Sequence, residues 1–249
     1  MSKIRKKRLD RTGEKYITNE GYEVEIIEYF NKNNCTILFN DNRIKTQIKF
    51  REIKKVKNPN HKTLYNIGFM GYGKYKAQIN KKKLKSYSVW AGILYRCYSE
   101  IGSAKHHSYK GCSVDLQWHN FQNFAEWFES NYVEDWQLDK DILVKGNKIY
   151  SPKTCCFVPK EINLLFTKNK IRRGEYPIGV SLNGDKFQST LHKGGKNYNL
   201  GLFNTPEEAF QAYKVVKESY IKEVADEWKD KINHKVYKAM YNYKVEITD

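Results

Sequence analysis

Hydrophobic and polar residues alternate near the start of the chain, on both sides of a turn at Asn33-Asn34. The apolar positions are Tyr22, Val24, Ile26, Cys35, Ile37 and Phe39. A period of two predicts antiparallel strands that bury one face. We therefore expect a small β-barrel over residues 18–60, which ends in a linker at Asn58-Pro59-Asn60. The pattern assigns this module no chemistry, and both a docking role and a contact with DNA stay open.

Two stretches in the middle of the chain space their apolar residues by three or four positions. The first contains Trp90, Ile93, Leu94 and Cys97, and the second contains Phe121, Phe124, Ala125, Trp127 and Phe128. This spacing predicts two amphipathic helices whose aromatic residues form a core.

The last alternating stretch follows Tyr176-Pro177 and contains three strand patterns. Their inward positions are Ile178, Val180, Leu182, Phe187, Ser189, Leu191, Tyr198, Leu200 and Leu202. Asn183-Gly184 is typical of a tight turn with two residues of positive φ, and Gly194-Gly195 predicts a second turn. A helix is expected after Thr205, because Thr205 and Glu208 suit a capping box. The stripe expected to pack on the sheet is Ala209, Ala212, Tyr213, Val216, Tyr220 and Val224.

The same alternation separates the two faces of this sheet. If the inward positions face the helix, the polar residues between them face outward. The candidate binding residues are Ser181, Asn183, Lys186, Gln188, Thr190 and His192, with Lys193 and Lys196 at the second turn. Their amide, hydroxyl and ammonium groups suit contacts with nucleic-acid bases and phosphates.

These patterns predict an α+β protein of several modules. The expected parts are a flexible basic arm (residues 1–17), the β-barrel (18–60), a module of helices and a β-hairpin (61–172), and a sheet with a helix and a C-terminal tail (173–249). The arm is expected because residues 1–15 hold seven lysines and arginines and almost no apolar residue that could join a core.

Charge narrows the class of partner. The chain has 45 Lys and Arg against 28 Asp and Glu, which is a formal net charge of +17. This surplus favours an anionic partner such as nucleic acid. No run of ~18 apolar residues is present, so we expect no membrane partner and a cytoplasmic protein. The five cysteines lack C-x-x-C spacing, which favours reduced, mostly buried thiols over a zinc ribbon.

One segment carries candidate chemistry for cleaving a phosphodiester. Asp139 lies in an expected strand, Lys145-Gly146-Asn147 is an expected turn, and Ser151-Pro152 is expected to begin a short helix. A strand, a turn and a helix of this size can hold a metal that neutralises phosphate charge and a base that activates water.

The region from about residue 90 to residue 163 resembles the HNH (ββα-metal) nucleases of phages and their homing endonucleases. The resemblance implies that Asp139 is a metal ligand and that Asn147 is the Asn that orients the catalytic base. It implies further that Thr154 and Asn163 complete a site for Mg²⁺ or Mn²⁺. Lys140 stands where the family has its catalytic His.

The lysine at residue 140 leaves several interpretations open. A protonated lysine is a better phosphate anchor than a base, so a nuclease would need a histidine from elsewhere. The candidate histidines are His106, His107 and His119. Asp141 is an alternative metal ligand to Thr154, because hard cations prefer carboxylate oxygen. Alternatively, Asp139 and Asp141 are exposed carboxylates that pair with lysines.

Residues from 176 to about 225 resemble the DNA-binding domain of plant ethylene response factors, which also occurs beside phage HNH homing endonucleases. The matching residues are Gly179-Val180, Phe187, Leu200-Gly201, Phe203, Thr205, Glu207-Glu208-Ala209 and Ala212-Tyr213. The resemblance implies that the sheet contacts double-stranded DNA. Ser181 and Asn183 replace the paired arginines of plant members, so the base specificity of those members does not carry over.

Together these features predict a phage-type DNA-binding protein. The preferred prediction is an HNH homing-type endonuclease that hydrolyses DNA phosphodiesters with a divalent metal. The alternative is a catalytically inactive, sequence-specific regulator or host-interaction protein on the same scaffold. RNA binding would require stacking aromatics on the outward sheet face, where the second strand is polar.

Overall fold

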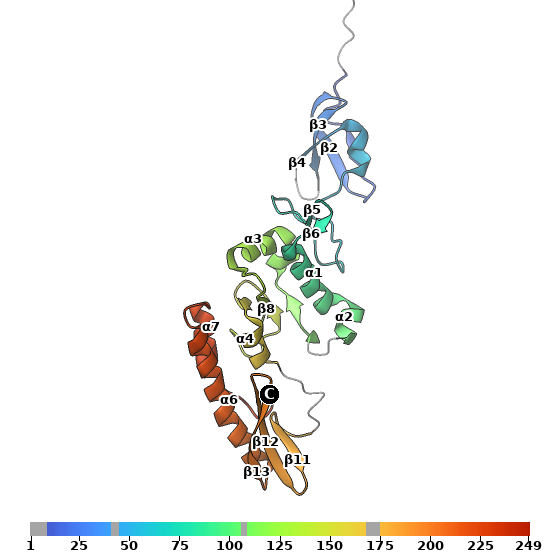
Figure 1. Ribbon diagram of the computed structural model, residues 1–249. Helices are drawn as coiled ribbons and strands as arrows, with labels where there is room; N and C mark the ends of the chain where they lie inside the picture. Colours follow the sequence, from blue (N-terminus) through green and yellow to red (C-terminus); the bar gives the residue numbers. More distant parts are fainter. Residues whose placement is uncertain (1–8, 41–44, 106–108, 168–174) are drawn as a thin grey trace, which may run out of the picture. The chain divides into compact units, whose positions relative to one another are not determined.

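The protein is an α+β chain, and the computed structural model describes its residues 9–40, 45–105, 109–167 and 175–249 (Figure 1). It divides into two compact units, Met1–Glu129 and Ser130–Asp249. This boundary lies inside the expected module 61–172 and does not coincide with the expected boundary at residues 172 and 173. Each unit is described by itself.

The first unit begins with an antiparallel sheet in the order β1-β2-β3-β4. Its elements are β1 (Lys15–Ile17), β2 (Glu23–Asn31), β3 (Asn34–Phe39) and β4 (Lys45–Ile48), followed by the 3-10 helix η1 (Phe50–Lys55). The predicted alternation is confirmed by complete burial of Val24, Ile26, Cys35, Ile37 and Phe39. The expected barrel is wrong, because β1 and β4 are the two edges of an open sheet among the described strands. Four short strands are too few to curl into closure.

Part of the expected flexible arm belongs to this sheet. Lys15 pairs with Glu25 in the β1–β2 ladder. The guanidinium carbon of Arg11 lies 4.5 Å from the ring centroid of Phe50, a favourable cation–π geometry. The arm therefore ends before Arg11 rather than at residue 17, and residues 1–8 lie outside the described part of the chain.

The predicted linker is a packed turn. The backbone N–H of Asn58 donates to the Glu20 carboxylate at 3.0 Å, and Asn58 itself is buried. The Tyr22 hydroxyl and Nδ1 of His61 are 3.0 Å apart. The turn is therefore held to the N-terminal sheet rather than free.

The rest of the first unit surrounds an aromatic core. Its elements are β5 (Gln78–Ile79), β6 (Lys82–Lys83), α1 (Lys85–Tyr98), α2 (Glu100–Lys105), β7 (Ser113–Val114), η3 (Leu116–His119) and α3 (Phe121–Asn131). Both predicted amphipathic helices are confirmed, and Trp90, Phe121 and Phe124 are fully buried. The indole N–H of Trp90 donates to the Trp118 carbonyl at 2.6 Å, which satisfies the polar atom that comes with burying a tryptophan.

The second unit begins with short strands and ends with a sheet and two helices. Its elements are β8 (Gln137–Asp139), β9 (Ile149–Tyr150), β10 (Cys156–Val158), α4 (Lys160–Leu165), β11 (Val180–Asn183), β12 (Lys186–Lys193), β13 (Lys196–Phe203), α6 (Pro206–Trp228) and α7 (His234–Tyr241). One hydrophobic core joins Val158 and Ile162 with Ile221 of α6 and Met240 of α7. Because of this shared core, the residues after 130 form one unit with the C-terminal sheet.

The prediction that a short helix begins at Ser151-Pro152 is wrong. Ser151 Oγ accepts the backbone N–H of Thr154 at 3.2 Å, as a cap would, but the chain makes only one turn. It then enters β10, which pairs antiparallel with β8 and buries Phe157. Strand pairing over a buried aromatic side chain ends the turn, and the helix begins instead after Pro159.

The predicted antiparallel sheet β11-β12-β13 is confirmed. The helix start is confirmed as well, because Thr205 and Glu208 form a reciprocal capping box ahead of α6. The first turn differs from the expectation. Asn183 pairs with Lys186, so the two loop residues are Gly184 and Asp185, and only Gly184 has positive φ.

The buried face of α6 is only partly the one predicted. Ala209, Tyr213 and Val224 are buried as expected, whereas Val216 is 37% exposed. Phe210, Ile221 and Ala225 are buried in addition. The reason is that α6 packs on the sheet and on α7, so its apolar face is wider than one stripe. Among the described residues, no helix has the length and apolar character that a membrane crossing requires.

All five cysteines are free thiols. Cys35, Cys112 and Cys155 are buried, while Cys97 and Cys156 are half-buried. Burial raises the pKa of Cys155 to about 12. The expectation that the cysteines are free thiols and mostly buried is confirmed.

Candidate nucleic-acid interface

Asp139, the predicted metal ligand, caps the turn that follows β8. Its Oδ1 accepts the backbone N–H of Asp141 at 2.8 Å and that of Ile142 at 2.7 Å. Burial, together with the charge of Asp141, raises the pKa of Asp139 to about 6, although the two backbone hydrogen bonds act in the opposite direction. The carboxyl group is therefore already engaged in holding the backbone.

Lys140 forms a salt bridge with Asp141, the carboxylate beside Asp139. Its Nζ lies 3.0 Å from Oδ2 of Asp141, and its side chain is only 11% exposed. A lysine held in this way neutralises the charge that a divalent cation would otherwise neutralise. One alternative held that Asp139 and Asp141 are exposed carboxylates paired with lysines. Asp141 fits this alternative, because it pairs with Lys140. Asp139 does not fit it, because its carboxyl group is largely buried.

Asn147 ties the turn to the strand before it. Its Nδ2 donates to the Lys140 carbonyl at 2.6 Å and to the Ile149 carbonyl at 2.8 Å. The backbone N–H of Ile149 donates back to Oδ1 of Asn147 at 3.2 Å. Asn147 thus positions the backbone of residue 140.

The two remaining predicted metal ligands are separated on different elements. The Thr154 hydroxyl lies in the turn before β10 and donates to the Ile149 carbonyl at 2.8 Å. Asn163 lies on α4, where its Nδ2 donates to Oε1 of Gln137 at 2.6 Å. Both side chains serve local structure.

The donor set does not fit a divalent cation. Hard cations need several free oxygen ligands, whereas one carboxylate oxygen of Asp139, one of Asp141 and the Thr154 hydroxyl take part in internal hydrogen bonds. Within the part of the chain that the structure describes, no three His, Cys, Asp or Glu side chains gather to hold a metal. His119 Nε2 lies 3.1 Å from the Val114 carbonyl, and His106 and His107 lie outside the described residues.

The outward face of the C-terminal sheet presents a different surface. In an antiparallel ladder, directly paired residues share a face, and Ser181 pairs with Gln188 while Asn183 pairs with Lys186. Helix α6 packs on the opposite face, where Ser189 and Leu191 are buried. The predicted division of the two faces is confirmed for β11 and β12, except that Leu182 is 54% exposed. On β13 it is wrong for Leu202, which was expected inward but pairs with the outward Gln188 and is exposed, and Tyr198 is exposed as well.

The third strand contributes residues that the sequence analysis did not propose. Gln188 pairs with Leu202, Thr190 with Asn199, and His192 with Asn197. A register shift opposite Ser189 and Thr190 leaves Leu200 of β13 without a partner in the ladder, so Asn197 and Asn199 lie on the same face as Leu202. The alternation of Asn197 and Asn199 with apolar residues could have identified them, once the register with β12 was known.

We call this surface the amide face. Its members are Ser181, Asn183, Lys186, Gln188, Thr190, His192, Asn197, Asn199 and Leu202. Two hydrogen bonds order it: Asn183 Nδ2 donates to Gln188 Oε1 at 2.9 Å, and His192 Nδ1 lies 2.8 Å from Asn197 Oδ1. Ordered side chains lose less conformational entropy when they bind.

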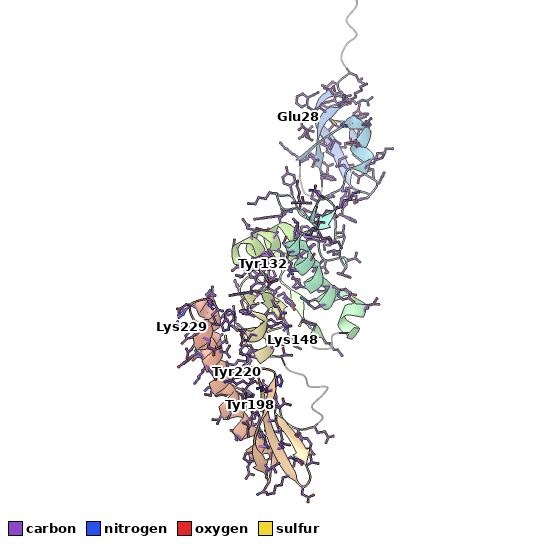
Figure 2. All side chains as sticks on the ribbon, in the orientation of Figure 1. Glu28, Tyr132, Lys148, Tyr198, Tyr220 and Lys229 are labelled. Atoms are coloured by element: carbon purple, nitrogen blue, oxygen red, sulfur yellow. The ribbon has the colours of Figure 1, made fainter. Side chains whose placement is uncertain are left out.

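Two predicted binding lysines lie apart from the amide face. Lys196 is exposed at the turn between β12 and β13. Lys193 turns toward α6, where its Nζ lies 2.7 Å from the Glu223 carboxylate and 4.6 Å from the ring centroid of Tyr220. Figure 2 labels Tyr220 on α6 and Tyr198 on β13, the strand that pairs with β12. Lys193 therefore links the sheet to the helix.

Comparison with known proteins found no matching family model, no similar curated protein and no similar solved structure.

Proposed function

We propose that the protein binds double-stranded DNA through the amide face. The observation that carries this proposal is the presence of four amide side chains on one sheet face that α6 leaves uncovered. They are Asn183, Gln188, Asn197 and Asn199. Asn and Gln offer a donor and an acceptor together, which is the pattern needed to read the major-groove edge of adenine.

The electrostatics of the whole chain support the same partner. A net charge of +17 attracts a polyanion and accelerates association with it. The amide face itself is nearly uncharged, with Lys186 as its one permanently charged member. Positive charge elsewhere in the chain would then supply non-specific affinity, while neutral amides supply base recognition.

The experiment selects preferred sites from a random pool of DNA duplexes and measures affinity by fluorescence anisotropy. Gln188→Ala and Asn199→Ala should each weaken binding to the selected site about 10-fold, because one bidentate contact contributes ~1–3 kcal/mol of discrimination. Binding to random duplex should stay within about 2-fold. Gln211→Ala, an exposed amide on α6, is the matched control and should change neither affinity.

Two results would contradict the proposal. One is a failure of selection to enrich any site, and the other is an equal loss for Gln211→Ala and Gln188→Ala. The endonuclease activity implied by the HNH resemblance stays a prediction. Incubation of the selected duplex with Mg²⁺ or Mn²⁺ tests it, and nicking that Asp139→Ala abolishes would establish it.

A further inference from the structure

A long segment of the first unit concentrates positive charge. Residues 53–99 contain ten lysines and one arginine and no aspartate or glutamate, so this segment accounts for +11 of the net charge of +17. Six of the lysines fall within residues 74–85, which we call the basic hairpin. They are Lys74, Lys76, Lys81, Lys82, Lys83 and Lys85, and all six are exposed.

The basic hairpin has a defined backbone. Strands β5 and β6 pair Gln78 with Lys83 and Ile79 with Lys82. The turn between them places Asn80 and Lys81 at positive φ, of 48° and 64°. A tight turn with two left-handed residues matches the twist of the flanking strands, so it fixes the backbone positions of Lys81, Lys82 and Lys83.

A buried glutamine fastens the base of this hairpin to α3. Gln122 Nε2 donates to the carbonyls of Met70 and Tyr75, both at 3.0 Å, and its Oε1 accepts the Tyr75 N–H at 2.9 Å. The backbone approaches closely enough that a Cβ at Gly73 would lie 2.4 Å from Gln122 Oε1. The lysines are thus presented by an anchored element.

This concentration of like charge is unfavourable for folding. None of the six lysines forms a salt bridge with a carboxylate among the described residues. The segment runs directly into α1, whose first turn has no acidic residue and whose N-cap, Leu84, makes no side-chain cap. A helix N-terminus carries positive partial charge, so lysines beside it repel that charge as well as one another. A bound polyanion would relieve both repulsions.

We propose that the basic hairpin binds the phosphate backbone of double-stranded DNA, as a second contact separate from the amide face. The inference rests on the proposed function for its choice of polyanion. A segment that inserts into a lipid surface has a broad apolar face, whereas residues 74–85 expose one large aliphatic side chain, Ile79.

The test replaces Lys81, Lys82 and Lys83 by Gln in the full chain and measures affinity for a random-sequence duplex at several salt concentrations. Each phosphate contact contributes ~0.9 to the slope of log affinity against log salt concentration. The triple variant should therefore lose about 2–3 units of slope and bind about 10-fold or more weakly. Its exposed substitutions should leave the circular dichroism unchanged and should not lower the melting temperature, because they remove like-charge repulsion.

The matched control replaces Lys229, Lys231 and Lys235, which are exposed in the second unit, by Gln. It removes the same net charge and should change the slope by less than one unit. Acetylation footprinting gives a second readout, in which bound duplex should protect Lys81, Lys82 and Lys83 but not Lys229. Equal losses in the two triple variants, or protection by phosphatidylglycerol vesicles or RNA but not by duplex, would overturn the proposal.

The two proposals can fail separately. If Gln188→Ala removes the sequence preference while the hairpin variant keeps the full salt slope, the amide face stands and the hairpin contact fails. If the hairpin variant loses part of the salt slope while selection enriches no site, the proposal for the basic hairpin stands and the proposal for the amide face fails.

Discussion

The backbone of Gly179 lies directly against the ring of Tyr213. A Cβ at residue 179 would come within 2.1 Å of Tyr213 Cδ2, and Gly179 has a φ of +78°. This contact joins the entry to β11 with the buried face of α6. It connects two of the residues on which the resemblance to the plant DNA-binding domain rests, and it gives both a packing role in orienting the sheet on its helix.

We predict that Gly179→Ala lowers the free energy of unfolding by about 2–4 kcal/mol, because overpacking and a left-handed non-glycine residue both cost stability. Chemical denaturation measures the change. Gly184→Ala is the matched control, since Gly184 also has positive φ but has no atom within 4 Å of its Cβ position. It should cost about 1–2 kcal/mol. Equal effects of the two substitutions would show that the ring contact is unimportant.

Ser189→Ala should stabilise the protein. The Ser189 hydroxyl is completely buried on the helix face of β12 and has no hydrogen-bond partner among the described residues. Removing an unsatisfied buried polar atom should raise the free energy of unfolding by about 1 kcal/mol. Ser181→Ala, on the exposed face, should change it by less than about 0.5 kcal/mol. A loss of stability with Ser189→Ala would contradict this account.

Lys217 should make stability depend on pH. Burial lowers the pKa of Lys217 to about 8 from 10.5. Below pH 8 the folded protein carries the full cost of the buried charge. Between pH 8 and 10.5 the folded protein releases this proton while the unfolded chain keeps it, so the free energy of unfolding rises with pH.

Tyrosines also ionise at about pH 10. Comparing the wild type with Lys217→Met therefore separates the contribution of Lys217 to the pH dependence from that of the tyrosines. The variant should be more stable than the wild type by about 1–3 kcal/mol at pH 7. The difference should shrink toward pH 10.5, as followed by urea denaturation. A difference that stays constant across this range would show that burial does not shift the titration of Lys217.

Asp139 should act as a structural cap rather than as a metal ligand. Asp139→Ala should lower the free energy of unfolding by about 1–2 kcal/mol, because two backbone N–H groups lose their acceptor. Asp139→Asn keeps an acceptor oxygen and should cost less. Mg²⁺ and EDTA should leave the melting temperatures of all three proteins unchanged. If Mg²⁺ raised the melting temperature of the wild type but not that of Asp139→Asn, Asp139 would be a metal ligand after all.

Local periodicity was enough to predict much of the fold. The alternation through Val24, Ile26 and Ile37 identified the N-terminal strands, and the capping pair Thr205 and Glu208 located the start of α6. The outward position of Gln188 followed from the same rule. Each of these features depends on residues a few positions apart, whose side chains or backbone groups meet within one element or one hairpin.

Contacts between distant residues decided the rest. The pairing of Asp139 with Cys156 across β8 and β10 turned an expected helix into a strand. The hydrogen bonds of Gln122 with residues near 70–75 made an anchored hairpin from a run of lysines. Sequence spacing alone determined which side chains share a face. Only tertiary packing determined which faces are covered, because burial and pairing depend on partners far away along the chain.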